Sequence, residues 1–257
     1  MLYGLTTMID SIREYWNKNI NDIEIAKYPI GTREFFDNLE TYHFEKLEYL
    51  PRIVSFNGYK GKRLLEVGCG LGIDLVHFAK GGAKVYGIDV AEKAIKLAEK
   101  NFELHGLDGE LHVMNGEDLN FNNNSFDVIY AHGVLTYTEN PQQMLHEIHR
   151  VLKPGGEAIL MMHNRNSWLF FLAKLLGVKL ERDDAPVVNT CTFSEFRQML
   201  NDFSSFEILL ERFPVKTRIH KGIKATLYNS LLVPVLNLIP KSLLRPFGAH
   251  LIAKAIK

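Results

Sequence analysis

The chain has 257 residues, with 30 lysines and arginines against 30 aspartates and glutamates, so its formal net charge at pH 7 is zero. This length suits one α/β domain with a full core and an added region. The balanced charge argues against a nucleic-acid partner, which usually requires a basic excess. Two cysteines, Cys69 and Cys191, are too few for a disulfide framework and favour the cytoplasm. The N-terminus lacks a signal-peptide pattern, and no apolar run reaches the ~18–20 residues that span a bilayer.

Two helices are predicted ahead of the first strand. Apolar residues at helical spacing indicate a helix over residues 8–18. A second amphipathic helix is predicted to begin after Thr32, its N-cap, and to end or kink at Pro51. Neither helix can join a parallel sheet. Two alternatives remain: a lid over the mouth of a site, or simple packing against the sheet edge.

From Arg63 onward, predicted strands alternate with predicted helices, which indicates a parallel sheet with helices on both faces. Pro154-Gly155-Gly156 is predicted to be a turn before the last of these strands. The expected strands are Arg63–Val67, Lys84–Ile88, Leu111–Met114, Phe126–Tyr130 and Glu157–Met162, and the expected helices are Ile73–Lys80, Ala91–His105 and Pro141–Leu152.

A glycine-rich turn follows the first of these strands, within Arg63–Asp74 (R-L-L-E-V-G-C-G-L-G-I-D). Alternating glycines between a strand and a helix bring bare backbone close to a ligand and point a helix N-terminus at it. The dinucleotide fingerprint G-x-G-x-x-G would need glycine at Ile73, and no Gly-Lys-Ser/Thr follows, so the turn is not a P-loop. The second strand ends in Asp89, where a βαβ unit places an acid against ribose hydroxyls.

These motifs, taken with N-G-E-D-L-N-F, S-F-D-V-I-Y-A-H-G-V-L and H-R-V-L-K-P-G-G, resemble those of class I S-adenosylmethionine-dependent methyltransferases. The resemblance covers about residues 60–165 and is strongest to the small-molecule, methyltransferase type 11-like subgroup. It implies a Rossmann-like seven-stranded sheet, mostly parallel with the last strand antiparallel. It also implies a helical lid (1–58), a cofactor-binding core (59–165) and a variable acceptor-side region (166–257).

The resemblance implies S-adenosylmethionine as cofactor, S-adenosylhomocysteine as product and no metal. Glu66 corresponds to an acid near the methionine amino group, Asp89 to the ribose ligand, and His132 to a contact with the methionine tail. Asn115 stands where the family often has aspartate near the adenine, and asparagine can accept that bond through its oxygen. The full set of expected cofactor-binding residues is Glu66, Gly68, Gly70, Gly72, Asp89, Val90, Asn115, Gly116, Glu117 and His132.

Catalytic and acceptor-binding residues are harder to predict. Related enzymes often read V-L-H-H where this chain reads V-L-T-Y-T, so a base at that point is in doubt. The remaining candidates for a base are His163, Tyr137 and, from the lid, Tyr28. Arg165 either binds an acidic acceptor or pairs with a nearby carboxylate, and Trp168 is expected to line the acceptor pocket.

The region after residue 165 contains an insertion at 214–248, rich in Leu, Ile and Val, between predicted strands 206–212 and 250–256. Its apolar residues predict an acceptor with an apolar portion. Its basic residues, Lys216, Arg218, Lys221, Lys224, Lys241 and Arg245, are compatible with peripheral contact with an anionic membrane. A packed subdomain with a solvated basic rim is the favoured alternative. The chain is expected to be a monomer or homodimer.

The leading hypothesis is therefore a methyltransferase acting on an oxygen, nitrogen or sulfur atom of a small molecule. A cofactor-binding scaffold or regulator without transfer activity is the alternative. A base- or amide-nitrogen methyltransferase is disfavoured because the position after the fourth strand reads A-H-G-V rather than D/N-P-P-Y/F. His146 and His149 lie one helical turn apart but lack an evident third metal ligand, and Cys69 is expected to be a packing residue.

Overall fold

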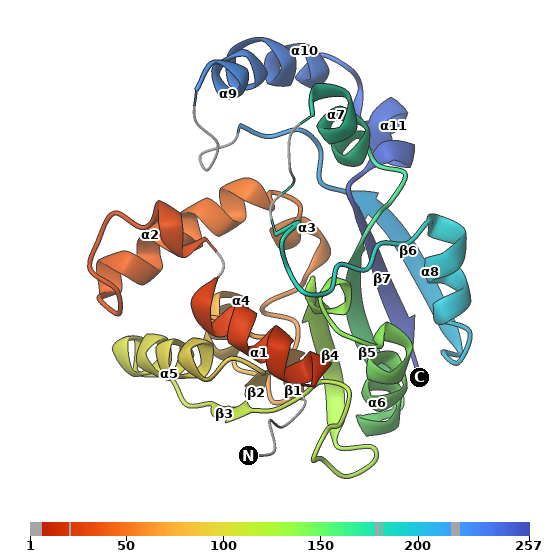
Figure 1. Ribbon diagram of the computed structural model, residues 1–257. Coiled ribbons are helices and arrows are strands. Elements are labelled where there is room, and N and C mark those ends of the chain that lie inside the picture. Colours follow the sequence, from red (N-terminus) through yellow and green to blue (C-terminus); the bar gives the residue numbers. More distant parts are fainter. Residues whose placement is uncertain (1–6, 21, 178–179, 181, 217–221) are drawn as a thin grey trace, which may run out of the picture.

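The computed structural model describes residues 7–20, 22–177, 180, 182–216 and 222–257. Its centre is a seven-stranded sheet in the order β3-β2-β1-β4-β5-β7-β6 (Figure 1). The strands are β1 (Arg63–Val67), β2 (Lys84–Asp89), β3 (Glu110–Val113), β4 (Phe126–His132), β5 (Leu152–His163), β6 (Ser205–Glu211) and β7 (His250–Ile256). The first five pair in parallel, and β7 lies antiparallel between β5 and β6. The predicted Rossmann-like sheet with an antiparallel last strand is confirmed.

Helices surround this sheet and extend beyond it. Those before and between the parallel strands are α1 (Met8–Lys18), α2 (Arg33–Lys46), α3 (Leu50–Ile53), α4 (Ile73–Lys80), α5 (Glu92–His105) and α6 (Pro141–Val151). Those that follow are α7 (Trp168–Leu176), α8 (Phe193–Met199), α9 (Ile223–Leu227), the π-helical η3 (Tyr228–Leu232), α10 (Val233–Asn237) and α11 (Lys241–Leu244). Short 3-10 turns are η1 (Ile23–Ile25), η2 (Val134–Thr136) and η4 (Arg245–Phe247).

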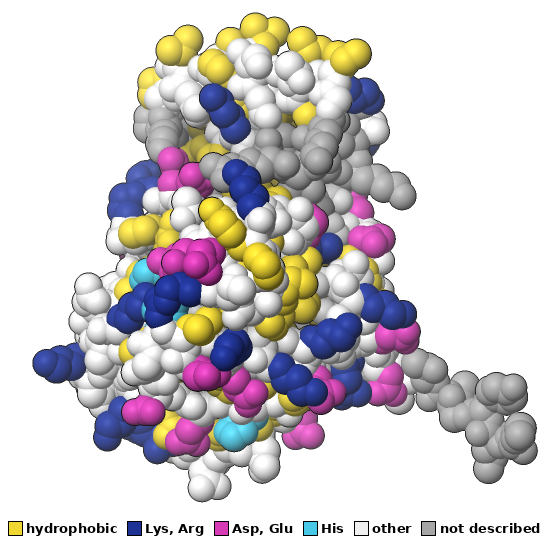
Figure 2. Space-filling model, turned by 90° about the vertical axis from the view of Figure 1, so that its left-hand side faces the viewer, with side chains coloured by type: hydrophobic (Ala, Val, Ile, Leu, Met, Phe, Trp, Pro, Cys, Tyr) yellow, Lys and Arg dark blue, Asp and Glu magenta, His cyan; other side chains and the backbone are white. Residues whose placement is uncertain are grey.

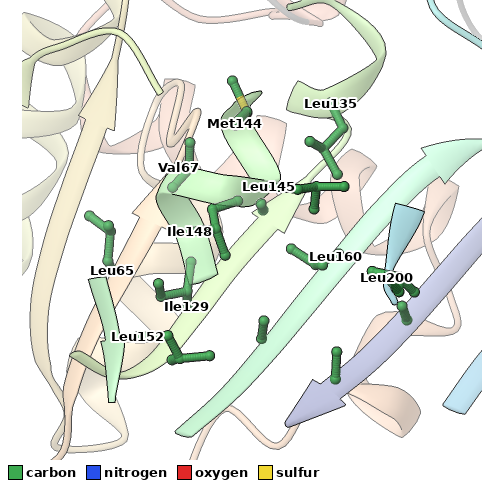
Figure 3. Close-up of a cluster of buried hydrophobic side chains, with 14 of the residues drawn as sticks. Leu65, Val67, Ile129, Leu135, Met144, Leu145, Ile148, Leu152, Leu160 and Leu200 are labelled. Atoms are coloured by element: carbon green, nitrogen blue, oxygen red, sulfur yellow. The ribbon is translucent and has the colours of Figure 1, made fainter. Parts of the chain in front are cut away.

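The core has one hydrophobic layer on each face of the sheet. Successive residues of β4 alternate between them: Ile129 packs under α6 and α8, whereas Val128 and Tyr130 pack under α3, α4 and α5. This alternation follows from the two-residue period of a strand. Figure 3 shows the first layer, in which Met144, Leu145 and Ile148 of α6 project onto β1, β4 and β5. Because both faces are buried, the ends of the parallel strands are left for function.

The N-terminal helices begin where capping chemistry predicts. The Thr32 side chain accepts a hydrogen bond from Phe35 N, and Thr7 and Asp10 form a capping box at the start of α1. The helix α2 ends at Lys46, and Pro51 lies in the first turn of α3, so the chain bends in this region. Buried α2 residues Phe35, Phe36 and Leu39 pack with Leu71 of the glycine turn and with Ile20.

The predicted turn at Pro154-Gly155-Gly156 lies inside β5. Leu152 pairs with Phe126, but the next paired residue is Glu157, opposite Val128, so the intervening residues form an irregular excursion. Gly155 has φ of 73°, a conformation that side chains rarely adopt. Its N–H donates to Lys257 O at 2.9 Å, which ties the excursion to the end of the chain.

The segment after β5 and the segment after β6 meet beyond the sheet. Figure 1 shows α7, α9, α10 and α11 together at one end of the molecule. The indole N–H of Trp168 in α7 donates to Arg212 O, which follows β6, at 2.9 Å. None of the helices formed by the described residues is long and apolar enough to cross a membrane.

Candidate functional site

Two adjoining pockets open at the carboxyl ends of β1 and β4, where the strand order reverses. Open α/β sheets bind ligands at such points. The pockets share the glycine turn and the segment after β4, namely Gly68, Gly70, Leu71, His132, Gly133 and Tyr137. The first pocket extends to the ends of β2 and β3, with Asp89, Val90, Asn115 and Gly116 among its other wall residues. The second extends to the ends of β5 and β7, with Glu66, Asp74, His163, Arg212 and His250 in its wall.

The N-terminal helices form part of both walls. Ile9, Ile12 and Trp16 of α1 line the first pocket, and Leu39, His43 and Lys46 of α2 line the second. The Trp16 ring meets Tyr137 edge-on, with centroids 5.1 Å apart. These contacts place α1 and α2 beside both pockets, and their role as a lid stays a prediction.

The glycine turn is held against β2 by its backbone. Gly68 N and Cys69 N both donate to Ile88 O, at 2.8 and 2.9 Å. Gly68 has φ of 75°, and a Cβ there would lie 2.8 Å from Val134 Cβ. No other residue fits this position without moving η2, so the glycine fixes how closely the two sides of the pocket approach.

Asp89 closes the first pocket at the end of β2. Its Oδ2 accepts from Gly70 N at 3.0 Å and its Oδ1 from Ala91 N at 2.9 Å. Burial raises the pKa of Asp89 above its usual value, although the backbone hydrogen bonds from Ala91, Gly70 and Val90 oppose the shift. The N-cap residue of α5 is Ala91 rather than Asp89, and α5 has no side-chain cap. The carboxylate therefore fixes the glycine turn and faces the pocket at the same time.

Glu66 and Asp74 form a buried pair of acids in the second pocket. Glu66 is 5% exposed, and its Oε2 has no hydrogen-bond partner among the described residues. Burial, followed by the charges of Asp74 and Asp89, raises the pKa of Glu66 well above its usual value. Burial acts in the same direction on Asp74, but His43 and Tyr130, both 2.9 Å away, outweigh it and lower the pKa of Asp74.

A hydrogen-bonded chain runs beneath the second pocket. Tyr49 Oη lies 2.5 Å from His250 Nδ1 and 2.8 Å from His132 Nε2, and Arg212 Nη1 lies 3.4 Å from His250 Nε2. Because an arginine can only donate, His250 accepts at Nε2, donates from Nδ1 to Tyr49, and Tyr49 donates to His132. Burial lowers the pKa of His132 to about 3 and that of His250 well below its usual value, so both rings are neutral. His132 Nε2 is thus engaged as an acceptor, which leaves it unsuited to act as a base.

His163, at the end of β5, lies above this chain. Its ring stacks on His250 with centroids 5.2 Å apart and meets Tyr137 edge-on at 6.0 Å. Leu169, Phe170, Leu180 and Val188 form an apolar part of the wall, and the charged residues Asp22, Arg182 and Asp183 line it as well. The second pocket thus combines an imidazole and a phenol with an apolar surface.

Most of the predicted cofactor-binding residues gather around these pockets. Gly68, Gly70, Glu66, Asp89, Val90, Asn115, Gly116 and His132 all line one or both. Two lie elsewhere. Gly72 begins α4 and packs on α5, where an added Cβ would be 3.3 Å from Ala98 Cβ. Glu117 turns away because its carboxylate accepts from the Thr138 hydroxyl and from Asn140 N.

The predicted acceptor residues divide differently. His163 and Tyr137 line the second pocket, whereas Tyr28, Arg165 and Trp168 line neither. Tyr28 is 48% exposed. Arg165 pairs with Glu195, which is the second of its two alternatives, and both side chains are half exposed on the surface. Trp168 turns toward Arg212 O. The role of these three residues in acceptor binding therefore stays a prediction, since a motif places a residue along the chain but not the direction of its side chain.

Several wall residues were missed. His43 and Lys46 lie on a helix predicted only by its apolar pattern, Arg212 directly follows β6, and His250 begins β7. No sequence pattern indicated that Arg212 would line the pocket. It is a non-glycine residue with a positive φ of 61°, and this conformation cannot be read from the sequence. His146 and His149 do not meet a third ligand: among the described residues, only Asp37, Glu40 and His105 form a group with metal-ligand spacing.

Comparison with known proteins agrees with this geometry. Residues 65–160 match the model of a methyltransferase domain. A ubiquinone biosynthesis O-methyltransferase from Alkalilimnicola ehrlichii is 30% identical over 172 residues, covering 63% of this chain and 69% of the relative. One from Chromobacterium violaceum is 28% identical over 162 residues, covering 60% and 68%. This chain belongs to the class I S-adenosylmethionine-dependent methyltransferases.

Solved structures show the same fold. Magnesium protoporphyrin IX methyltransferase from Synechocystis, with bound S-adenosylhomocysteine, superposes with a TM-score of 0.60 at 16% identity and covers 98% of this chain and 100% of its own. A methyltransferase from Aquifex aeolicus gives 0.55 at 18% identity, covering 86% and 96%. These structures show the fold alone. The matched methyltransferase domain and the O-methyltransferase relatives show that the chain is an S-adenosylmethionine-dependent methyltransferase acting on a small molecule, and they give no support to the scaffold alternative.

Proposed function

We propose that S-adenosylmethionine binds in the first pocket, with its methionine part reaching the second. Asp89 would accept hydrogen bonds from the ribose hydroxyls, as it already does from two backbone N–H groups. Val90, Asn115 and Gly116 would hold the adenine. Glu66, His132 and the backbone of Gly68 and Gly70 would surround the methionine part.

Three features of the chain fit this cofactor. Glu66 Oε2 is buried and has no partner among the described residues, which is costly unless a ligand donor arrives. A Cβ at Gly70 would meet nothing within 4 Å, so this backbone faces open space rather than protein. The Asp89 carboxylate stands at the pocket wall, where Gly70 and Ala91 hold it in place.

We further propose that the methyl group passes to a hydroxyl oxygen of an acceptor that carries an apolar portion. The observation that carries this proposal is the lining of the second pocket, where His163 and Tyr137 lie in the same wall as the apolar residues Leu169 and Phe170 of α7. The relatives named for ubiquinone biosynthesis are O-methyltransferases. The oxygen assignment follows their chemistry, and the apolar portion follows the pocket wall.

S-adenosylmethionine, when bound, supplies an electrophilic methyl group on a sulfonium that is a good leaving group. The chain's task is to align the acceptor, exclude water and accept a proton. We propose that His163 accepts the proton of the acceptor hydroxyl, because His132 Nε2 already accepts a hydrogen bond from Tyr49. The α1 and α2 residues in the pocket walls exclude water. This scheme needs no metal ion.

A panel of acceptors tests the proposal. Phenols and catechols that differ only in the length of an alkyl chain are incubated with the protein and methyl-labelled S-adenosylmethionine, and methylated products are identified by mass spectrometry. We expect methyl ethers, formed faster as the alkyl chain lengthens. Transfer to amine or thiol analogues alone would reject the oxygen assignment. Transfer that ignores the alkyl chain would reject the apolar portion.

His163 is expected to act in the chemical step. Replacing it with glutamine (His163→Gln) should lower kcat by about a hundredfold or more, because general-base catalysis contributes about 10²–10⁴-fold. The affinity for S-adenosylmethionine should stay the same. The measurement is kcat and KM on the best acceptor, together with calorimetric titration of the cofactor. His146→Gln, at an exposed histidine of α6, is the matched control, and equal kcat values for both variants would exclude His163 as the base.

A further inference from the structure

The helical stretch α9–η3–α10 presents an apolar stripe to the outside. Its exposed members recur every three or four residues, which places them along one side of a helix. They are Ile223, Leu227, Leu231, Val235 and Leu238, with exposed fractions of 82, 57, 63, 51 and 84%. In a surface helix of an ordinary soluble domain this side would be polar.

The opposite side of the same stretch is already packed. Ala225 and Val233 are 8% and 3% exposed, and Val233 and Asn237 line a hollow together with Tyr42 of α2. The outer stripe is therefore not the side by which this stretch packs on the rest of the protein. The stretch is apolar on both sides, and one of those sides has no counterpart among the described residues.

Other exposed apolar residues lie at the same end of the molecule. Nine of the fifteen large hydrophobic residues exposed in the described chain come from α7 and from residues 223–247. The four besides the stripe are Phe171, Leu175, Leu243 and Phe247. In Figure 2, hydrophobic side chains line the outermost end of the molecule, where Figure 1 places α9 and α10. Apolar surface concentrated in this way marks an interaction site.

The charge of the segments that carry these exposed residues indicates which kind of surface they would bind. The whole chain is neutral, yet residues 213–249 contain six lysines and arginines and no aspartate or glutamate. Residues 166–180 likewise contain two lysines and no acid. Lys174, Lys216, Lys224 and Arg245 are exposed, whereas Arg218 and Lys221 lie outside the described residues. Within these two segments, apolar side chains are flanked by basic ones and by no acid, and this composition complements an anionic lipid surface. Glu45 and Glu48 lie on the inner side, where they line the same hollow as Lys216.

We propose that the stripe and α7 form a docking surface for an anionic membrane. The stretch α9–η3–α10 would lie in the plane of the interface, with its outer apolar residues among the lipid chains and the flanking basic residues at the headgroups. The sequence left a packed subdomain as the favoured alternative. The exposed stripe, which only the tertiary structure reveals, is the reason we favour the membrane instead.

Docking would also serve the second pocket. In α7, Leu169 and Phe170 line that pocket, whereas Phe171 and Leu175 are 68% and 67% exposed on the outer side. One helix thus separates the acceptor wall from the proposed membrane surface, and an apolar acceptor would reach the pocket without crossing bulk water. This link rests on the proposed function, whereas the docking itself does not.

Vesicle co-sedimentation of the full chain tests the docking, without turnover. We expect binding to vesicles of phosphatidylcholine and phosphatidylglycerol and much weaker binding to phosphatidylcholine alone. A stripe variant, Leu227→Ser with Leu231→Ser and Leu238→Ser, should lose binding. A charge variant, Lys174→Glu with Lys216→Glu and Arg245→Glu, should bind about tenfold or more weakly, because each basic residue near an anionic surface contributes about 1 kcal/mol.

Matched controls use the opposite parts of the surface. Lys60→Glu with Lys62→Glu and Lys84→Glu reverses three exposed charges beside the amino ends of β1 and β2. Ile30→Ser with Val113→Ser removes two exposed apolar residues elsewhere. Both controls should bind vesicles like the unmodified chain. Circular dichroism and thermal melting confirm that each variant is folded.

A fluorescent label on one stripe residue gives a second test, in which the other apolar residues of the stripe stay in place. Cys69 and Cys191 are buried, so a single Leu231→Cys substitution can be labelled selectively with an environment-sensitive dye. The emission should shift to shorter wavelength on adding anionic vesicles, and the same dye at Val113→Cys should not respond.

Three results would overturn the proposal. The first is absence of binding to anionic vesicles by the unmodified chain. The second is binding that the stripe variant retains, since this would reflect charge alone. The third is a stripe variant that changes a dimer into a monomer in sedimentation velocity while no form binds vesicles. That result would assign the stripe to a second copy of the chain.

Discussion

Replacing Asp89 with alanine lowers the affinity for S-adenosylmethionine by about a hundredfold or more. The carboxylate is proposed to accept from both ribose hydroxyls, and hydrogen bonds to charged groups contribute about 1.5–3 kcal/mol each. Asp89 also anchors Gly70 N and Ala91 N, so the glycine turn loses part of its support as well. Isothermal titration with the cofactor measures the change.

The control for this variant is another acid close in sequence. Glu92 lies three residues further on, is exposed, and pairs with Lys96 one helical turn away. Glu92→Ala should bind the cofactor like the unmodified chain. Unchanged affinity in Asp89→Ala, with a normal melting curve, would show that the ribose lies elsewhere.

The raised pKa of Asp89 adds a pH dependence with a definite sign. Because burial is the main cause and raises the pKa, Asp89 takes up a proton at a higher pH than an exposed aspartate does. Cofactor binding needs the ionised form, so the affinity should fall as the pH is lowered through this raised pKa. In Asp89→Asn the affinity should be low at every pH, and this acid-side decline should disappear.

Glu66→Gln is expected to stabilise the cofactor-free protein while weakening cofactor binding by about tenfold or more. Glu66 is buried with an unpartnered oxygen, and burial raises its pKa well above the usual value. A raised folded-state pKa means that the contribution of Glu66 to stability is fully present below its unfolded pKa and is lost as the pH rises through the folded pKa. The neutral amide avoids that loss, so the gain should appear near neutral pH and vanish in acid.

Thermal unfolding across pH measures this prediction. The gain in Tm should be a few degrees at neutral pH, since about 1 kcal/mol shifts Tm by about 2–4 °C in a chain of this size. Calorimetric titration follows the cofactor affinity in the same variant. The opposing signs separate a ligand-binding acid from a merely structural one.

Glu147 supplies a control with the reverse sign. It is also buried, but Arg150 and Leu119 N hold its pKa below the usual value. Glu147→Gln should therefore lower Tm at neutral pH, and the loss should shrink as the pH falls through the lowered pKa. If Glu66→Gln instead destabilised the protein at all pH values, Glu66 would be a structural residue rather than a cofactor ligand.

Local chemistry made much of the fold predictable. The helix bounds at Met8–Lys18 and Ile73–Lys80 agree with the sequence prediction, and Gly106, with φ of 61°, ends α5 as predicted. These features depend on neighbours in the chain: a capping side chain, a left-handed glycine, an apolar repeat. The strand ends were less predictable, as β5 shows, because a strand's bounds depend on which partner it pairs with.

The sequence by itself determined the glycine turn and the acid at the end of β2, because each follows from short-range spacing, whereas the antiparallel last strand of the sheet was expected only from the family resemblance. Only the tertiary structure decided the direction of long side chains and which distant segments meet. Arg165 pairs with Glu195 on the surface. In contrast, Arg212, which follows β6, and His250 of β7 join Tyr49 and His132 under the second pocket. The exposed stripe on α9–η3–α10 is of the same kind, because a helix that is apolar on two sides does not reveal from its sequence which side the protein covers.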